Sequence, residues 1–187
     1  MKNLLVVVFI LTVQVSFAQS FRGLDKSPMD MAYYPDDFAH DRKFAPQKVG
    51  NEAFVRVTYT RTAKKEREIF GKLVPFAKVW RVGANEAPEI KFYKDVTFGG
   101  QKVKAGVYTL MAIPNENEWT LILNSDLDVW GAYSYDDKKD VVRVMAKSQK
   151  LEEVVENLSI QFKKGEKGEA IMRLAWDKTL VELPIEF

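Results

Sequence analysis

The stretch LSIQFKKGEKGEAIMRLAW, residues 158–176, decides the fold class of this chain. Every second residue from Leu158 to Phe162 is apolar, and the same alternation returns from Ala170 to Trp176 after the turn sequence KGEKG. Successive side chains of a β-strand point to opposite faces of a sheet, so each alternation is typical of a strand with one buried face. Two such runs around a glycine-containing turn predict an antiparallel hairpin.

Further strands follow from the same pattern elsewhere in the chain. In residues 54–60, Val55, Val57 and Tyr59 alternate with polar side chains, and Gly99-Gly100 is a turn signal. Other strand candidates are residues 89–93, 94–98, 107–113, 118–124, 141–147 and 180–185. About eight or nine short strands without a long helix predict an all-β domain over residues 51–187, an antiparallel, jelly-roll-like β-sandwich.

Residues 19–50 lack this pattern. They are rich in proline and aspartate and show no sustained period of 2 or 3.6 residues. Because proline interrupts regular structure, we expect an irregular, extended N-terminal arm in front of the domain. Its aromatic side chains, Tyr33, Tyr34 and Phe38, are expected to lie against the domain.

Residues 1–18 have the layout of a secretory signal peptide. Lys2 supplies the positive start, residues 4–11 are an unbroken apolar run, and small residues at Ser16 and Ala18 suit signal peptidase. We expect cleavage before Gln19 and export to the periplasm, the cell surface or the extracellular space. The apolar run is shorter than the roughly 20 residues of a membrane-spanning helix, and no second such run follows, so no transmembrane segment is expected after cleavage.

The composition excludes several classes of function. The chain has no Cys and one His, His40, so it cannot form a disulfide scaffold, a cysteine-ligated metal site, a thiol nucleophile or a multi-histidine metal site. We expect no bound metal and no cofactor. The net charge is +2, and basic residues are interleaved with acidic ones, as in residues 64–68. This pattern gives no reason to expect nucleic acid as a partner.

The segment IFGKLVPFAKVWRVGANEA, residues 69–87, is dense in residues that strand periodicity does not require. It resembles the signature of a bacterial exported family called domain of unknown function 2911. Further matches are AGVYTL at 105–110, WGAYSY at 130–135, and Ile113, Pro114, Trp119, Asn124, Asp140 and Arg143. The resemblance extends from about Pro46 to the end of the chain. It implies a signal peptide and a β-rich domain, and it brings no established activity.

Within this segment, Trp80, Arg81, Asn85 and Glu86 are the strongest candidate site residues. Arg81 and Glu86 flank a glycine turn, at a spacing that allows a bidentate ion pair, with Trp80 stacked on the guanidinium and Asn85 bonded to the backbone. Two interpretations remain open. In one, Glu86 is a general acid or base and Arg81 binds an anion. In the other, the pair is a buried latch that holds a long loop to the sandwich.

An aromatic loop is the second candidate site. Trp130, Tyr133 and Tyr135 surround Gly131 and are suited to stacking on sugar rings or peptide side chains. The alternative is that these rings cap one end of the hydrophobic core.

Together these features favour an exported bacterial envelope protein that acts as a non-catalytic binding or protein-interaction module, with its site on loops at the end of the sandwich. Envelope glycan, peptide or another envelope protein is the expected partner. One alternative is a carboxylate-dependent hydrolase acting on glycan or peptide, with Glu86 as a catalytic residue. The other is a structural subunit of an envelope complex, in which the arm 19–50 holds the partner.

Overall fold

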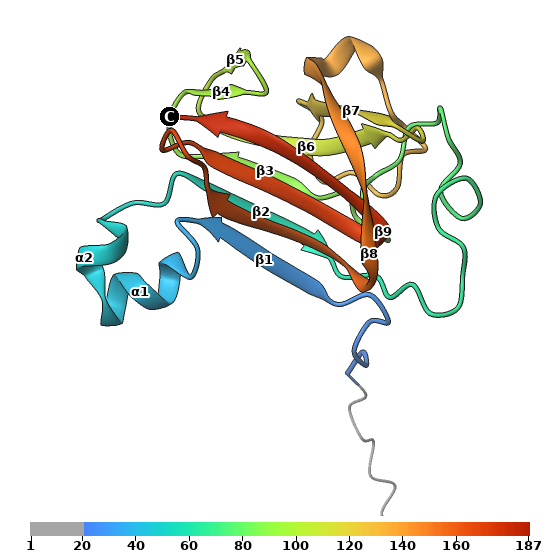
Figure 1. The fold of residues 1–187 in the computed structure, drawn as a ribbon, viewed down its shortest axis with the longest axis horizontal. Coiled ribbons are helices and arrows are strands. Elements are labelled where there is room, and N and C mark those ends of the chain that lie inside the picture. Colours follow the sequence, from blue (N-terminus) through green and yellow to red (C-terminus); the bar gives the residue numbers. More distant parts are fainter. Residues whose placement is uncertain (1–20) are drawn as a thin grey trace, which may run out of the picture.

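The computed structural model describes residues 21–187 (Figure 1). The strands are β1 (Met29–Tyr34), β2 (Val55–Thr60), β3 (Glu89–Phe92), β4 (Val96–Phe98), β5 (Gln101–Val103), β6 (Gly106–Ile113), β7 (Glu118–Asn124), β8 (Asp140–Lys164) and β9 (Ala170–Glu186). The helices are α1 (Phe38–Phe44), α2 (Pro46–Val49) and the short 3₁₀ helix η1 (Asp137–Lys139). The predicted signal peptide lies outside the described residues. Among residues 21–187, no helix has the length and apolar character needed to cross a membrane.

The strands form an antiparallel sheet in the order β1-β2-β3-β6-β7-β8-β9-β4-β5. The predicted all-β fold class is confirmed, and the described residues contain nine strands. Both predicted hairpins are present. Gly99 and Gly100, with φ of 54° and 86°, connect β4 to β5, which is the conformation that a two-residue hairpin turn requires. Residues 165–169 connect β8 to β9.

Strand β8 belongs to two parts of the sheet. Residues 140–147 pair with β7, and residues 148–164 pair with β9. Register shifts between Lys150 and Ser159 mark bulges, and bulges bend a strand. The sequence predicted two separate strands here, because the mostly exposed residues 151–157 interrupt the alternation. Pairing with β9 on both sides of the bulges joins them into one strand.

The largest of three hydrophobic clusters lies inside the curved sheet. Val55, Val57 and Tyr59 of β2 point into it, as their alternation predicted, and all three are buried. They belong to a cluster that includes buried side chains from every strand from β3 to β9, and Ala32 and Tyr34 of β1 pack against it. Burial of one large apolar side chain contributes about 1.5–3 kcal/mol, so this cluster is the main source of stability.

The N-terminal arm is more regular than the sequence predicted. Residues 29–34 form β1, which pairs with β2 from Met29 opposite Thr60 to Tyr34 opposite Val55, and α1 and α2 follow. The predicted contact of its aromatic residues with the domain is confirmed. Phe38 is buried in a cluster against which Tyr33 and, from the domain, Tyr93 pack, and Tyr34 stacks on Phe187 at 5.7 Å. The strand was missed because one of its inward positions is Asp30 and because its partner is distant in sequence.

The connection from β2 to β3, residues 61–88, is long and contains no regular element. Figure 1 shows it as the long green segment on the side away from α1 and α2. It carries the whole 69–87 segment, so the tertiary structure of this connection decides where the candidate residues lie.

Candidate functional site

The connection 61–88 is attached to the sheet beside β6. The backbone N–H of Trp80 donates to the carbonyl of Ala112 at 2.7 Å, and the N–H of Ala112 donates back at 2.9 Å. The N–H of Ala77 donates to Pro114 at 2.9 Å. These bonds satisfy the free edge of β6 beyond the end of β3 and hold residues 77–80 in a fixed position.

The side chain of Trp80 lies in the core and not on the surface. It is 7% exposed and packs between Trp176, stacked at 6.0 Å, and Trp119, edge-on at 5.9 Å. Phe70 adds an edge-on contact at 5.8 Å. Such aromatic arrangements are favourable beyond the area that they bury. Trp80 therefore anchors the connection to the hydrophobic core, and it is not part of a surface site.

The predicted ion pair between Arg81 and Glu86 is not formed, which corrects the expectation of a buried latch. Glu86 is exposed, and no ion pair within residues 21–187 involves either side chain. The backbone provides the reason. Val82, Gly83 and Asn85 have φ of 52°, 150° and 57°, so the backbone between Arg81 and Glu86 is turned and not extended. Spacing in the sequence does not reveal these turns.

The turn at Gly83 is held by a buried hydroxyl of β2. Thr60 Oγ1 accepts from the N–H of Ala84 at 2.9 Å and donates to the carbonyl of the same residue at 2.9 Å. A Cβ on Gly83 would lie 2.6 Å from Thr60 Oγ1, so only glycine fits at this position. The sequence analysis did not identify Thr60 as a residue that supports the site, because in the sequence it is only a polar residue at the end of a predicted strand.

Two candidate segments meet directly. The N–H of Gly131 donates to the carbonyl of Asn85 at 2.9 Å, and the N–H of Ala87 donates to the carbonyl of Val129 at 2.9 Å. These bonds form an antiparallel bridge that places Glu86 opposite Trp130. The side chain of Asn85 donates to Asp25 at 3.0 Å, so residues near the start of the described chain also reach this point. The structure thus joins Asn85 and Glu86 of the first predicted site to the aromatic loop, whereas Trp80 lies apart from it in the core.

The aromatic loop has a packed side and an exposed side. Val129 is buried with Ala87, Met111 and Ile122 on the outer face of β6 and β7, where it holds the loop down. On the other side, Trp130 is 58% exposed and Tyr133 is 88% exposed. A Cβ on Gly131 would lie 2.6 Å from two carbons of the Tyr133 ring, so this ring rests on the glycine backbone. The loop therefore presents two large aromatic side chains from a fixed backbone.

Tyr135 belongs to the support of the loop. Its hydroxyl donates to Asp140 Oδ2 at 2.6 Å and accepts from Arg143 Nη2 at 2.8 Å, and Arg143 Nε also bonds the same carboxylate oxygen at 2.6 Å. Burial and then the hydrogen bond to Asp140 raise the pKa of Tyr135 to about 12. The hydrogen bond to Asp140 is the main cause that raises the pKa of Arg143.

The same network fixes the start of the loop. Asn124 Nδ2 donates to Asp140 Oδ1 at 2.8 Å and to the carbonyl of Asp136 at 3.0 Å, and Asn124 Oδ1 accepts from the N–H of Asp126 at 2.9 Å. Both ends of the loop are thus tied to one carboxylate, that of Asp140. Asn124, Asp140 and Arg143 stood out in the sequence through the family resemblance, but their shared role depends on the pairing of β7 with β8.

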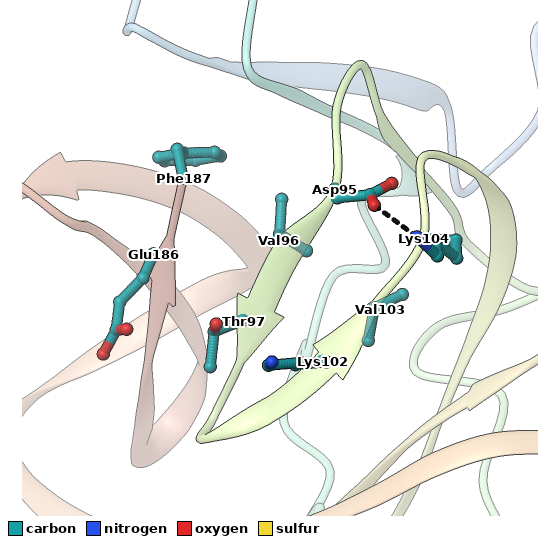
Figure 2. Close-up of a pocket in the computed structure, with 8 residues that line it drawn as sticks. All are labelled: Asp95, Val96, Thr97, Lys102, Val103, Lys104, Glu186 and Phe187. Carbon is teal, nitrogen blue, oxygen red and sulfur yellow. Dashed lines mark hydrogen bonds and ion pairs between the residues drawn. The ribbon is translucent and has the colours of Figure 1, made fainter.

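A pocket of about 340 Å³ lies elsewhere, between the β4–β5 hairpin and the end of β9 (Figure 2). Asp95 and Lys104, two of its lining residues, form an ion pair at 2.7 Å. This bond lowers the pKa of Asp95 and raises the pKa of Lys104. No predicted site residue lines the pocket. Among residues 21–187, no group of three or more His, Asp or Glu side chains is placed to hold a metal ion.

The fold and the site define a class: an antiparallel β domain that presents two exposed aromatic side chains on a supported loop. The chain belongs to the family described as protein of unknown function (DUF2911), whose family model matches residues 41–185. This match confirms the resemblance noted in the sequence and covers most of the chain. A search of curated proteins and a search of solved structures found no match.

Proposed function

We propose that this protein is an exported bacterial envelope protein that works as a non-catalytic binding module, with its site on the loop around Trp130 and Tyr133. The observation that carries the proposal is the exposure of these two rings, 58% and 88%, on a loop that is held by the buried Val129 and the hydrogen-bonded Tyr135. Binding costs less when the binding residues are already held in place, because fewer rotamers and backbone angles are lost.

The support beneath the rings strengthens this proposal. Val129 packs on β6 and β7, and Tyr135 is bonded to Asp140 and Arg143. Exposed aromatic side chains on protein loops commonly form the centre of a binding surface, because a rigid ring buries a large area at a low entropic cost. The ligand groups that such rings accept are sugar rings and peptide side chains.

A thermal-shift experiment on residues 19–187 tests the binding function. The probes are soluble envelope oligosaccharides and short synthetic peptides, one class at a time. We expect one class to raise the melting temperature by several degrees, because a ligand that binds only the folded state stabilises it. Trp130→Ala and Tyr133→Ala should abolish that shift.

The matched control is Phe44→Ala, which removes an exposed aromatic ring from α1, outside the loop. It should leave the shift unchanged. If Trp130→Ala and Tyr133→Ala also leave it unchanged, or if no probe class produces a shift, the proposal is wrong. Hydrolysis of a bound probe that is lost in Glu86→Gln would instead establish the hydrolase alternative.

Export is tested separately. The chain expressed in its bacterial host should appear in the envelope or medium with Gln19 as its first residue. Replacing Ala18 with arginine should block cleavage, because signal peptidase requires a small residue there. Recovery of the uncleaved chain from the cytoplasm of the unaltered strain would contradict the proposal.

A further inference from the structure

Glu86 and Trp130 face the same side of their two-residue bridge. The bridging hydrogen bonds run from Gly131 to Asn85 and from Ala87 to Val129, each 2.9 Å long. Glu86 and Trp130 therefore occupy a non-hydrogen-bonded position of an antiparallel pair. At such a position the two side chains project to the same side and lie closest together, with Cβ atoms about 4.5–5.5 Å apart.

Among the residues that the structure describes, no cation forms an ion pair with the carboxylate of Glu86. Among residues 21–187, Asp126 is paired with Lys139, Asp140 with Arg143, and Glu182 with Lys163, but no ion pair includes Glu86. Glu86 is exposed, as is the indole of Trp130 beside it. An exposed carboxylate and an exposed indole thus lie side by side, and none of residues 21–187 forms an ion pair with this carboxylate.

The aromatic loop carries carboxylates of its own. From residue 125 to residue 137 every charged side chain is a carboxylate, and although Asp126 is paired with Lys139, no ion pair among the described residues includes Asp128, Asp136 or Asp137. A further carboxylate, that of Glu89, lies next to Asp128: its Oε1 accepts a hydrogen bond from the backbone N–H of Asp128 at 3.1 Å. Several carboxylates near an aromatic surface produce a negative potential that attracts cationic groups and repels anionic ones.

We propose that Glu86 and Trp130 together bind the guanidinium or ammonium group of a basic side chain in a partner polypeptide. This inference rests on the proposed binding function and names the partner for the same loop. The face of an indole attracts a cation through its quadrupole, and an adjacent carboxylate adds a charged hydrogen bond. Glu86 and the carboxylates of residues 128–137 that have no ion-pair partner within residues 21–187 match a segment with more than one Lys or Arg, which a polypeptide supplies and a neutral glycan does not.

The test follows the indole N–H signal of Trp130 by NMR, assigned through Trp130→Phe. The probes are the peptide acetyl-Gly-Arg-Gly-Arg-Gly-amide and its citrulline counterpart, in which an uncharged isostere replaces each Arg. An oligosaccharide of N-acetylglucosamine is the third probe. We expect the Arg peptide to shift the Trp130 signal in low salt, with weaker binding as salt screens the charges. The citrulline peptide should bind at least about threefold more weakly.

Two variants separate the inference from the proposed function. Glu86→Gln should lower the affinity for the Arg peptide by about threefold or more. Glu116→Gln, which changes an exposed carboxylate outside the loop, should leave that affinity unchanged. Equal binding of both peptides, or unchanged affinity in Glu86→Gln, overturns the inference and leaves the binding function standing. If only the oligosaccharide shifts the Trp130 signal, the inference is likewise overturned and the binding function stands. If no probe shifts the Trp130 signal, the inference fails together with the binding function at this loop.

Discussion

The hydroxyl of Thr60 forms two hydrogen bonds with one residue, Ala84: it accepts from the N–H and donates to the carbonyl, each at 2.9 Å. Thr60 is the last residue of β2, and Ala84 lies 24 residues later in the connection that carries the candidate site. This side chain, 1% exposed, therefore fixes the turn from which Asn85 and Glu86 reach the aromatic loop.

We predict that Thr60→Val destabilises the protein, because valine keeps the shape but leaves the N–H and carbonyl of Ala84 without their partner. A buried polar group that loses its partner costs about 1–3 kcal/mol. Urea unfolding measures the change. Thr60→Ser, which keeps the hydroxyl, is the control and should be the more stable variant. A valine variant as stable as the wild type would show that the hydroxyl does not hold the turn.

Gly83→Ala should be more destabilising than Gly100→Ala. Both glycines have positive φ, 150° and 86°, so each alanine variant has a strained backbone that costs about 1–3 kcal/mol. Only at Gly83 does the new Cβ also meet another atom, Thr60 Oγ1 at 2.6 Å, whereas nothing lies within 4 Å at Gly100. Chemical denaturation of the two variants compares them. Equal losses would mean that the contact with Thr60 can relax without cost.

Trp80→Ala should destabilise the protein much more than Trp130→Ala, because the first ring lies in the core and the second on the surface. Trp80 is 7% exposed and Trp130 is 58% exposed. Loss of a buried tryptophan costs about 3–5 kcal/mol, while a surface substitution changes stability by about 0.5 kcal/mol or less. Thermal unfolding of both variants provides the measurement. A large loss in Trp130→Ala would place its ring in the core and remove the basis for the binding site.

The stabilisation provided by the Tyr135 hydroxyl should depend on pH. Because the pKa of Tyr135 is raised from 10.0 to about 12, the folded state holds the phenolic proton more tightly than the unfolded state. The stabilising effect is therefore complete below about pH 10 and is lost as the pH rises toward about 12. The difference in unfolding free energy between wild type and Tyr135→Phe should shrink over that range. A difference that stays constant up to about pH 12 would contradict the assignment.

Truncation should distinguish the two parts of the N-terminal arm. A chain that begins at Pro28 loses the bond between Asp25 and Asn85 but keeps β1, so its melting temperature should stay close to that of the longer chain. A chain that begins at Asn51 also loses β1 and Phe38, and it should be less stable by about 3 kcal/mol or more because the apolar face under β1 becomes exposed. Equal stability of the two chains would mean that β1 does not contribute to the fold.

Most strands were predictable because their signal is local. Residues 54–60, 158–162 and 170–176 alternate in register with the sheet face, so the period of the side chains shows both the strand and its buried side. The glycine turns at 99–100 and 165–168 were equally visible, since φ angles favourable to glycine follow from residue type. β1 was missed because its alternation is weak and its pairing with β2 is a long-range contact.

The neighbours of Glu86 show what the sequence alone does not contain. Spacing along the chain suggested Arg81 as its partner, but left-handed backbone at Val82 and Asn85 turns the chain, and the bridge to residues 129–131 puts Trp130 opposite Glu86 instead. The sequence by itself determined every strand but β1 and β5, the buried faces of those strands, the family and the aromatic loop, because these depend on local period and residue type. Only the tertiary structure decided which loops meet, because that depends on the hydrogen bonds of backbone groups far apart in the chain.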